Sequence, residues 1–346
     1  MKEITVVIPN YNGMKYLPEC MTSLCLEQQE APEYEVLIID NASADGSVEY
    51  LYREWCTENT IDQTVGQNGV KAQKSRCNIR LILLPENTGF CHAVNLGIRE
   101  AHTPYVILLN NDTKVAPGFI RGLYDAISAD EKIFSVSAKM LMWDKPELVD
   151  DAGDRYCAFG WAYSRGKGRP ATSYDKPVSV FSACGGAAIY RRSVFEKIGY
   201  FDEAHFAYLE DLDIGYRARI YGYENRYAPK AKVLHYGSAS TGSRYNPRKT
   251  ELASANSVYV IAKNMPLLQW LLNLSFFLLG FGIKFLFFCK KRMGKLYLKG
   301  LLAGWKRSVS PVGRQAKVPF RWAHLWNYVK IQWQLYLNVF RILMKS

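Results

Sequence analysis

The stretch Ile4-Thr5-Val6-Val7-Ile8-Pro9-Asn10-Tyr11-Asn12-Gly13 decides the fold class. Its first five residues form a continuous β-branched run, which is typical of a strand buried on both faces of a parallel sheet. Proline, asparagine and glycine then end the run, because these residue types favour turns. We therefore expect a buried strand that leads directly into a polar loop.

Outward from this strand, apolar runs alternate with segments of helical spacing. This alternation predicts an α/β domain with a parallel sheet, in which ligands bind at the carboxyl ends of the strands. Further strands are expected at residues 35–39, 79–84, 105–109, 134–138, 184–190, 226–229 and 232–236, and helices at residues 14–24, 47–55 and 89–101. The polar residues 57–78 are expected to form a surface insertion, and residues 150–180 a loop-rich region.

Two carboxylates follow strands of the expected sheet, Asp40 after the second and Asp112 after the fourth. Asp40 can accept a hydrogen bond from the imide N–H of uracil or thymine, and Asp112 can bind a hard divalent cation that bridges two phosphates. The alternative is that each is a turn residue. The sequence contains neither the G-x-G-x-x-G fingerprint after its first strand nor a P-loop, which argues against those two nucleotide sites.

A second acidic group lies in Tyr208-Leu-Glu-Asp-Leu-Asp213, where three carboxylates fall within four residues. At a helix start, Glu210 and Asp213 share a face, while Asp211 points about 100° away. Neighbouring carboxylates raise each other's pKa, so one of them can serve as a general base. The alternative is a helix N-terminus whose acids suit the helix dipole.

Charge divides the chain into two unequal parts. Residues 244–346 carry 18 Lys and Arg against one acid, whereas residues 1–243 are mildly acidic. Such asymmetry indicates an anionic partner. Because the basic residues are interleaved with Leu and Phe, they favour an anionic membrane surface over nucleic acid. The eight cysteines have no zinc-ligand spacing and no signal peptide precedes them, which favours reduced thiols in a cytosolic domain.

Two segments of the basic part are apolar and have the length of membrane helices. Residues 265–289 could span a bilayer, but Gln269, Asn273, Gly280 and Lys284 form a polar stripe along them. Residues 327–345 have a similar stripe. We expect in-plane membrane helices that turn Lys and Arg toward anionic lipid. The alternative is that both helices pack on the catalytic domain or on a second protomer.

A set of short motifs carries a family resemblance. In order, they are Val6–Gly13, Ile39–Ser47, Glu86–Phe90 with Asn95–Gly97, Leu109–Asp112, Gly185–Gly186, Tyr208–Asp213 and His235–Ser238. Together they resemble the inverting family 2 glycosyltransferases of the GT-A fold, and most of all the bacterial rhamnosyltransferase-like branch that builds cell-surface polysaccharides. The match covers roughly residues 3–265. It implies a GT-A catalytic domain over residues 1–265 and a basic, apolar helical tail over residues 266–346 that associates with a membrane.

The resemblance also implies a role for each matching residue. Asp211 would be the catalytic base, with Glu210 beside it. The nucleotide would be bound by Pro9, Tyr11, Asn12, Asp40, Asn87 and Asn111, and the donor sugar and acceptor would lie against Gly185 and Gly186. Asp112 and His235 would hold a divalent cation, Mn²⁺ or Mg²⁺. Since Asn110-Asn111-Asp112 keeps only the last Asp of the family's D-x-D motif, dependence on metal is left open; His235 alone could also be a strand-end imidazole bonded to backbone.

The expected function is inverting transfer of a sugar from a UDP- or dTDP-linked donor to a glycan acceptor, with rhamnose as the first choice of sugar. A lipid-linked acceptor would explain the tail and would place the protein, peripheral or monotopic, on the cytoplasmic face of the cell membrane. Galactosyl, galactofuranosyl or N-acetylglucosaminyl transfer, and a non-catalytic membrane scaffold, are the alternatives. The linkage is not specified, and homo-oligomerisation is left open.

Overall fold

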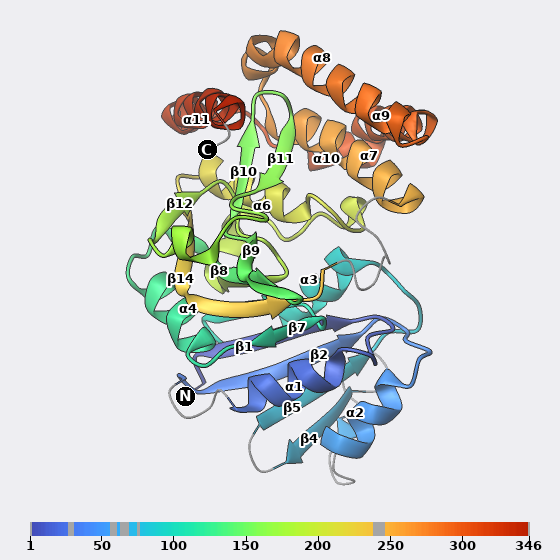
Figure 1. Ribbon diagram of the computed structural model, residues 1–346, viewed down its shortest axis with the longest axis vertical. Helices are drawn as coiled ribbons and strands as arrows, with labels where there is room; N and C mark the ends of the chain where they lie inside the picture. The colour runs from blue at the N-terminus through green and yellow to red at the C-terminus, as the bar shows by residue number, and fades with distance from the viewer. Residues whose placement is uncertain are drawn as a thin grey trace.

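The computed structural model describes residues 2–26, 31–55, 61–62, 69–74, 77–237 and 246–344. Its centre is a mixed sheet, which within these residues has twelve strands. Four parallel strands form one half of the sheet, in the order β6 (Tyr105–Leu109), β1 (Ile4–Asn10), β2 (Tyr34–Asp40) and β5 (Cys77–Leu83). The predicted α/β sheet is thus confirmed, and the opening stretch supplies its central strand (Figure 1).

Helices cover both faces of this sheet because side chains of a strand alternate between its faces. Val6 and Ile8 of β1 pack with α1 (Leu17–Leu26) and α4 (Phe119–Ser128), whereas Val7 packs with α3 (Phe90–Glu100). Helices α2 (Ser47–Trp55), α5 (Arg192–Ile198) and α6 (Glu210–Ile220) complete the layers. The two apolar layers leave the strand ends free for polar residues.

The second half of the sheet contains both parallel and antiparallel strands. Strand β13 (Ala187–Arg191) is antiparallel to β6 and to β8 (Ile133–Met142), and β14 (Glu224–His235) is parallel to β8. The two short strands predicted at residues 226–229 and 232–236 are therefore one strand, which has an irregularity between Ala228 and Lys232. Shorter strands are β7 (Thr113–Val115), β9 (Lys145–Asp151) and β12 (Val178–Val180).

Two sequence predictions need correction here. Part of the expected insertion at residues 57–78 belongs to the sheet, because β3 (Ile61–Asp62) and β4 (Gly69–Lys74) extend it beyond β5; the rest of it lies outside the described residues. A polar edge strand has few apolar residues, which is why composition did not reveal it.

Cys25 is disulfide-bonded, contrary to the expectation of reduced thiols, while Cys20, Cys91, Cys157, Cys184 and Cys289 are free.

The C-terminal part of the chain forms a helical layer at one end of the molecule (Figure 1). It consists of α7 (Pro247–Asn264), α8 (Leu267–Lys290), α9 (Gly294–Val309), α10 (Pro311–Ala316) and α11 (Leu325–Leu343). A hairpin of β10 (Asp154–Cys157) and β11 (Trp161–Ser164) rises into this layer from the part of the chain that contains the sheet. Tyr163 of β11 donates a hydrogen bond to the carbonyl of Asn338 in α11 at 3.2 Å.

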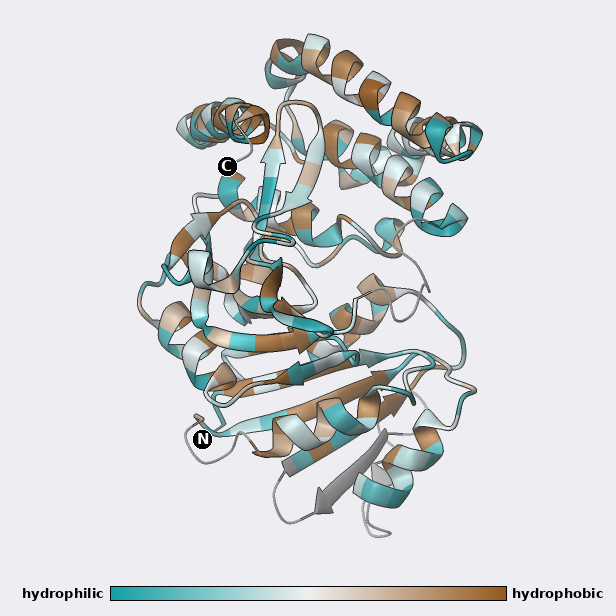
Figure 2. Cartoon of the chain, in the orientation of Figure 1, coloured by the Kyte–Doolittle hydropathy of each residue, from teal (hydrophilic) through white to brown (hydrophobic). Residues whose placement is uncertain are grey.

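Helix α8 turns its polar stripe inward and its apolar side outward. Gln269 accepts a hydrogen bond from the Tyr216 hydroxyl at 2.6 Å, and Asn273 exchanges hydrogen bonds with Gln332 of α11. By contrast, the leucines of α8 are exposed, Leu268 to 68% and Leu278 to 70% (Figure 2). By length and composition, α8 is the one helix among the described residues that could cross a membrane.

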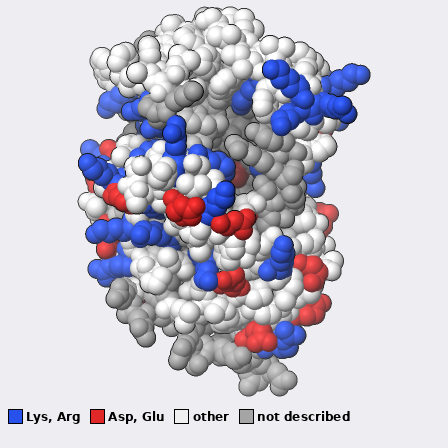
Figure 3. Space-filling view, in the orientation of Figure 1, with Lys and Arg blue, Asp and Glu red and all other residues white. Residues whose placement is uncertain are grey.

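Helix α11 has the same inverted polarity. Asn327 and Asn338 donate to the carbonyls of Ile220 and Tyr156, while Trp326 and Trp333 are exposed. The polar stripes were expected to face lipid headgroups; instead they attach both helices to the preceding part of the chain, which was the alternative. On the face seen in Figure 3, Lys and Arg gather at the sides of the helical end, and its outer surface carries few charged atoms.

Candidate active site

The ends of three neighbouring strands carry a continuous group of polar side chains. Asn10, fully buried at the end of β1, donates from Nδ2 to Asp40 Oδ1 at 2.7 Å and accepts from Asn111 Nδ2 at 2.6 Å. Because β1 lies between β2 and β6, Asn10 joins the residues that follow both neighbours. Asp40 and Asn111, two predicted nucleotide-binding residues, are thereby brought together.

The loops after β1 and β2 are fastened to each other by reciprocal hydrogen bonds. Asn12 donates from its backbone to Ser43 Oγ at 2.9 Å, and its side chain accepts from the backbone of Ala44 at 2.9 Å. Asn12 and Ala42 have positive φ, an uncommon conformation for residues other than glycine. The backbone of Pro9 to Asn12 is therefore held in place, and the Tyr11 side chain beside it is exposed.

Asn87, another predicted nucleotide-binding residue, forms a turn at the start of α3. Its Oδ1 accepts from the backbone N–H of Gly89 at 3.0 Å. Asn41 fixes the same turn, since it accepts from the Thr88 backbone at 2.9 Å and donates to the Gly89 carbonyl at 3.1 Å. The turn thus borders the loop that follows Asp40.

Asp112 and His235 also come together as predicted. Asp112 directly precedes β7, and β7 pairs with β14 so that Thr113 lies opposite His235. His235 Nε2 is 3.5 Å from Asp112 Oδ1, and its Nδ1 is 2.7 Å from Asp150 Oδ2. Burial disfavours the charged imidazole, yet hydrogen bonds to Asp112 and Asp150 raise the pKa of His235 to about 9.

The Asp112–His235 pair fits a divalent cation that is also bound by the phosphates of a substrate. Among the described residues, no group of three or more His, Cys, Asp and Glu is placed to hold a metal ion. Mg²⁺, however, is usually bound through one or two carboxylates plus substrate phosphates. The Asp150–His235 hydrogen bond is the kind that fixes the ring of a metal-binding histidine. Binding at this pair would release the imidazole proton.

Asp211 lies in the first turn of α6, after an unusual loop. Phe206, Tyr208 and Leu209 all have positive φ, which is energetically costly for large side chains and occurs mostly at functional sites. Asp211 Oδ1 accepts from the Leu212 backbone at 2.7 Å, and its Oδ2 lies 3.4 Å from the backbone nitrogen of Gly185. The loop therefore determines where the predicted base stands.

Gly185 and Gly186 connect the two acidic groups. A Cβ atom on Gly185 would lie 3.9 Å from Asp211 Cβ, and the Gly186 carbonyl accepts from the Asn110 backbone at 2.8 Å. The segment thus runs from Asp211 to the turn that carries Asp112. The predicted catalytic, metal and sugar positions consequently form one site.

Burial changes the acidity of both adjacent carboxyl groups. It raises the pKa of Glu210, and repulsion from Asp211 raises it further. Burial also raises the pKa of Asp211. Among the described residues, none forms a hydrogen bond with Glu210 Oε2. A carboxylate with a raised pKa is a stronger base, which suits proton abstraction from a hydroxyl.

Two arginines of α6 are held by contacts within the protein. Arg217 is buried and donates to Asp213 at 2.8 Å, and Arg219 contacts Gln334 of α11. Asp213 in turn receives hydrogen bonds from Lys263 at 2.9 Å and Asn264 at 2.7 Å. These groups anchor α6 to its neighbours.

Family models match most of the chain. The model described as glycosyl transferase family 2 covers residues 5–199, and that of glycosyl transferase family group 2 covers residues 105–336. The chain belongs to glycosyl transferase family 2. It is therefore a glycosyltransferase, and the resemblance seen in its motifs is confirmed at the level of the family.

Individual proteins agree with the family. The chain is 27% identical over 291 residues to an N-acetylglucosaminyl-diphospho-decaprenol L-rhamnosyltransferase from Mycobacterium tuberculosis, with 74% of this chain and 83% of that protein covered. This supports the rhamnosyltransferase-like branch. TarS 1-349 from S. aureus, solved with UDP-GlcNAc, superposes with a TM-score of 0.56 at 16% identity, covering 96% of this chain and 89% of TarS.

GalNAc-T7, solved with UDP, GalNAc and Mn²⁺, also has a TM-score of 0.56, at 17% identity. The superposition covers 76% of this chain and 48% of GalNAc-T7, so this glycosyltransferase spans about half the length of that protein. Together, the two structures confirm the GT-A fold.

Sequence reasoning missed a residue that supports the loop before Asp211. Asn256 of α7 is fully buried and donates from Nδ2 to the carbonyls of His205, Ala207 and Tyr208 at 3.1, 2.9 and 2.7 Å. Its Oδ1 accepts from Arg307 Nη1 of α9 at 2.7 Å. A contact across about 50 residues leaves no local sequence signal. In this family 2 enzyme, the C-terminal helices therefore support the loop that precedes Asp211.

Two further acids of this glycosyltransferase were missed as well. Asp151 and Asp154 flank the start of the hairpin, and their charges act on each other and on Asp211. Burial raises the pKa of both. Asp151 is almost fully buried, and its Oδ2 has no hydrogen-bond partner in the described part of the chain. The only available signal was their number, three acids within residues 150–154, in a region that we interpreted as loops.

Proposed function

We propose that this glycosyltransferase moves a sugar, with inversion, from a nucleotide diphosphate donor to a glycan on a lipid carrier. The single observation that carries the proposal is the continuity of the site. Asp211 lies against Gly185, Gly186 is bonded to the turn of Asp112, and Asp112 faces His235. A base and a cation-binding pair thus lie on two sides of one short backbone segment.

In the proposed reaction, Asp40 and the backbone of Pro9 to Asn12 bind the nucleotide base, with Asn87 and Asn111 beside them. Asp211 takes the proton of the acceptor hydroxyl while the oxygen of that hydroxyl bonds to the anomeric carbon of the donor sugar. The bond from that carbon to the diphosphate breaks on the opposite face, and the diphosphate leaves with the electron pair. Glu210 beside Asp211 has a raised pKa, so it tends to keep its own proton and adds little negative charge next to the base. A positioned base contributes about 10²–10⁴-fold to such a rate.

Asp112 and His235 are the residues proposed to hold Mn²⁺ or Mg²⁺. When bound, the cation would neutralise charge on the departing diphosphate. GalNAc-T7, which shares the fold, was solved with Mn²⁺. The Asn110-Asn111-Asp112 turn offers one carboxylate, so we expect weaker metal binding than two carboxylates would give.

L-Rhamnose is the proposed sugar, and cell-surface polysaccharide the proposed product. The support is the name of the Mycobacterium tuberculosis relative, an N-acetylglucosaminyl-diphospho-decaprenol L-rhamnosyltransferase. The same name supports a lipid-linked acceptor. Galactose, galactofuranose and N-acetylglucosamine are the alternatives, with a UDP- or dTDP-linked donor.

We also propose that residues 1–265 are the catalytic domain and residues 266–346 a membrane-associating tail on the cytoplasmic face of the cell membrane. The support is the exposed apolar side of α8 and α11 together with the excess of basic residues. Trp326 and Trp333 suit the membrane interface, and nearby Lys and Arg suit anionic lipid.

Nucleotide binding followed by transfer tests the function. Thermal unfolding should be measured with UDP, dTDP or GDP, each with and without Mn²⁺, and a ligand at 100 times its Kd should stabilise the fold by about 2.7 kcal/mol. The matching nucleotide sugar should then be consumed only when a lipid-linked acceptor is added. Asp112→Asn should abolish the contribution of Mn²⁺ and keep the nucleotide shift. No shift with any nucleotide would favour the non-catalytic scaffold.

A further inference from the structure

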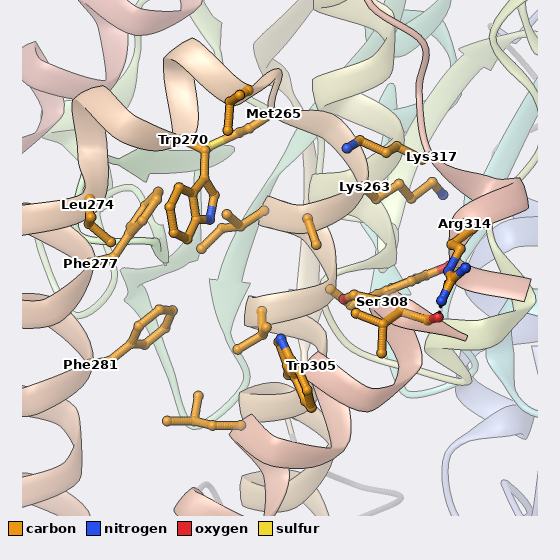
Figure 4. Close-up of a pocket in the computed structure, with 18 of the residues that line it drawn as sticks. Lys263, Met265, Trp270, Leu274, Phe277, Phe281, Trp305, Ser308, Arg314 and Lys317 are labelled. Atoms are coloured by element: carbon orange, nitrogen blue, oxygen red, sulfur yellow. Dashed lines mark hydrogen bonds between the residues drawn. The ribbon is translucent and has the colours of Figure 1, made fainter. Parts of the chain in front are cut away.

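A cavity of about 810 Å³ lies among α7, α8, α9 and α10. Its volume is in the range of about 300–1,000 Å³ that is usual for small-molecule sites. Most of its lining is apolar, with aromatic rings from Trp270, Phe277, Phe281 and Trp305. Figure 4 shows Trp270, Phe277 and Phe281 on one side and the basic residues Lys263, Arg314 and Lys317 on the other, with Trp305 between them. The cavity therefore has an apolar body and a cationic end.

The cavity is continuous with the exposed apolar side of α8. Leu267, Trp270 and Leu278 line it, and all three are also exposed at the surface. An apolar ligand could therefore enter from a membrane on which this side of the protein rests, without crossing water.

The cationic end is formed by Arg314 and Lys317, which are both exposed. Lys263 lies there too, but it is already paired with Asp202 and Asp213. Among the described residues that line the cavity, none carries a carboxylate. An anionic headgroup therefore complements this end, and a guanidinium with an ammonium suits phosphate oxygens.

We propose that this cavity binds the isoprenoid chain of the acceptor's lipid carrier, with the carrier's diphosphate at Arg314 and Lys317. This inference rests on the proposed function, which supplies a lipid-linked acceptor. The cavity wall leads to the catalytic helix: Tyr259 bonds to Asp202 at 2.9 Å, and Lys263 bonds to Asp213, two residues after Asp211. A lipid held here is anchored beside the element that carries the base.

Binding of farnesyl diphosphate to the full chain in non-ionic detergent tests the proposal. Calorimetry should be done with saturating UDP so that the nucleotide site is blocked. Farnesyl diphosphate should bind more tightly than farnesol, because farnesol has no diphosphate to pair with Arg314 and Lys317. It should also bind more tightly than inorganic diphosphate, because each buried methylene contributes about fourfold to affinity. Arg314→Gln with Lys317→Gln should weaken it at least about tenfold. Lys290→Gln with Lys295→Gln, basic positions of the same tail that do not line the cavity, should leave it unchanged.

A second pair of variants tests the apolar body. Leu274→Trp fills the cavity and should weaken binding by about tenfold or more, whereas Leu271→Trp, on the exposed side of α8, should not. Equal binding by all these variants would overturn the proposal, as would equal competition from phosphatidylglycerol in mixed micelles. Failure of the function is separate: UDP- or dTDP-sugar would then remain unconsumed with every acceptor, whatever the farnesyl diphosphate result.

Discussion

Replacing Asn256 by alanine should disable catalysis while leaving donor binding nearly intact. The change removes the donor for three backbone carbonyls and the acceptor for Arg307. Each buried group left unpaired costs about 1–3 kcal/mol, and water can satisfy part of the loss, so we expect the free energy of unfolding to fall by about 2–4 kcal/mol. Residues 206–209, with three positive φ values, would then relax and displace Asp211. A displacement near 1 Å can cost about 10² in kcat.

The assay separates positioning from general damage. Steady-state transfer kinetics should give kcat lowered about 10²-fold and a donor KM within about threefold of wild type, since nucleotide contacts lie elsewhere. Ser257→Ala is the matched control, because the adjacent hydroxyl donates to the Ala253 carbonyl of its own helix. Arg307→Ala removes one of the four hydrogen bonds and should fall between the two.

A wild-type kcat in Asn256→Ala, shown to be folded by its thermal transition, would contradict a positioning role for Asn256. A donor KM that rises in proportion to the loss of kcat/KM would contradict it too, since that pattern means lost binding rather than a displaced base.

Three other predictions follow from the site and its surroundings. Asp211→Asn should keep the nucleotide-induced thermal shift and lower kcat by at least about 10²-fold; wild-type turnover would contradict its role as the base. Because the folded chain holds the Glu210 proton above the ordinary glutamate pKa of about 4.3, the free energy of unfolding should fall as the pH rises from that value toward about 8. Glu210→Gln should flatten this dependence in a denaturation series, and an unchanged slope would contradict the raised pKa. Leu279→Asn should weaken sedimentation with anionic vesicles by about tenfold, whereas Leu26→Asn, on an exposed leucine of α1, should have no effect.

Local signals were sufficient for the parallel half of the sheet. The β-branched run at Ile4–Ile8 and the later apolar runs fall on β1, β2, β5 and β6, because a strand buried on both faces must be apolar throughout. Asp40 and Asp112 followed from the same logic, since parallel strands end at one edge.

Contacts between distant segments could not be predicted in the same way. Asn10 could not be recognised locally, because its side-chain partners Asp40, Ser43 and Asn111 are 30, 33 and 101 residues away. The side-chain partners of Asn256 are 48 to 51 residues away. For α8 and α11, a polar stripe has the same spacing whether it faces water or protein, so periodicity located the stripe but not its direction.

The inverted polarity of α8 and α11 has a practical consequence for making the enzyme. Deleting an apolar tail is a common way to obtain a detergent-free enzyme, but here the deleted piece would include the partners of Tyr216 and Ile220. A cut before Lys263 would also remove two donors to Asp213. Substitution of exposed apolar residues is the better strategy. Hydrophilic residues at outward positions such as Leu268, Leu279 and Trp326 would leave the inward hydrogen bonds of both helices in place. Crystallographers should therefore redesign this surface and keep the full chain.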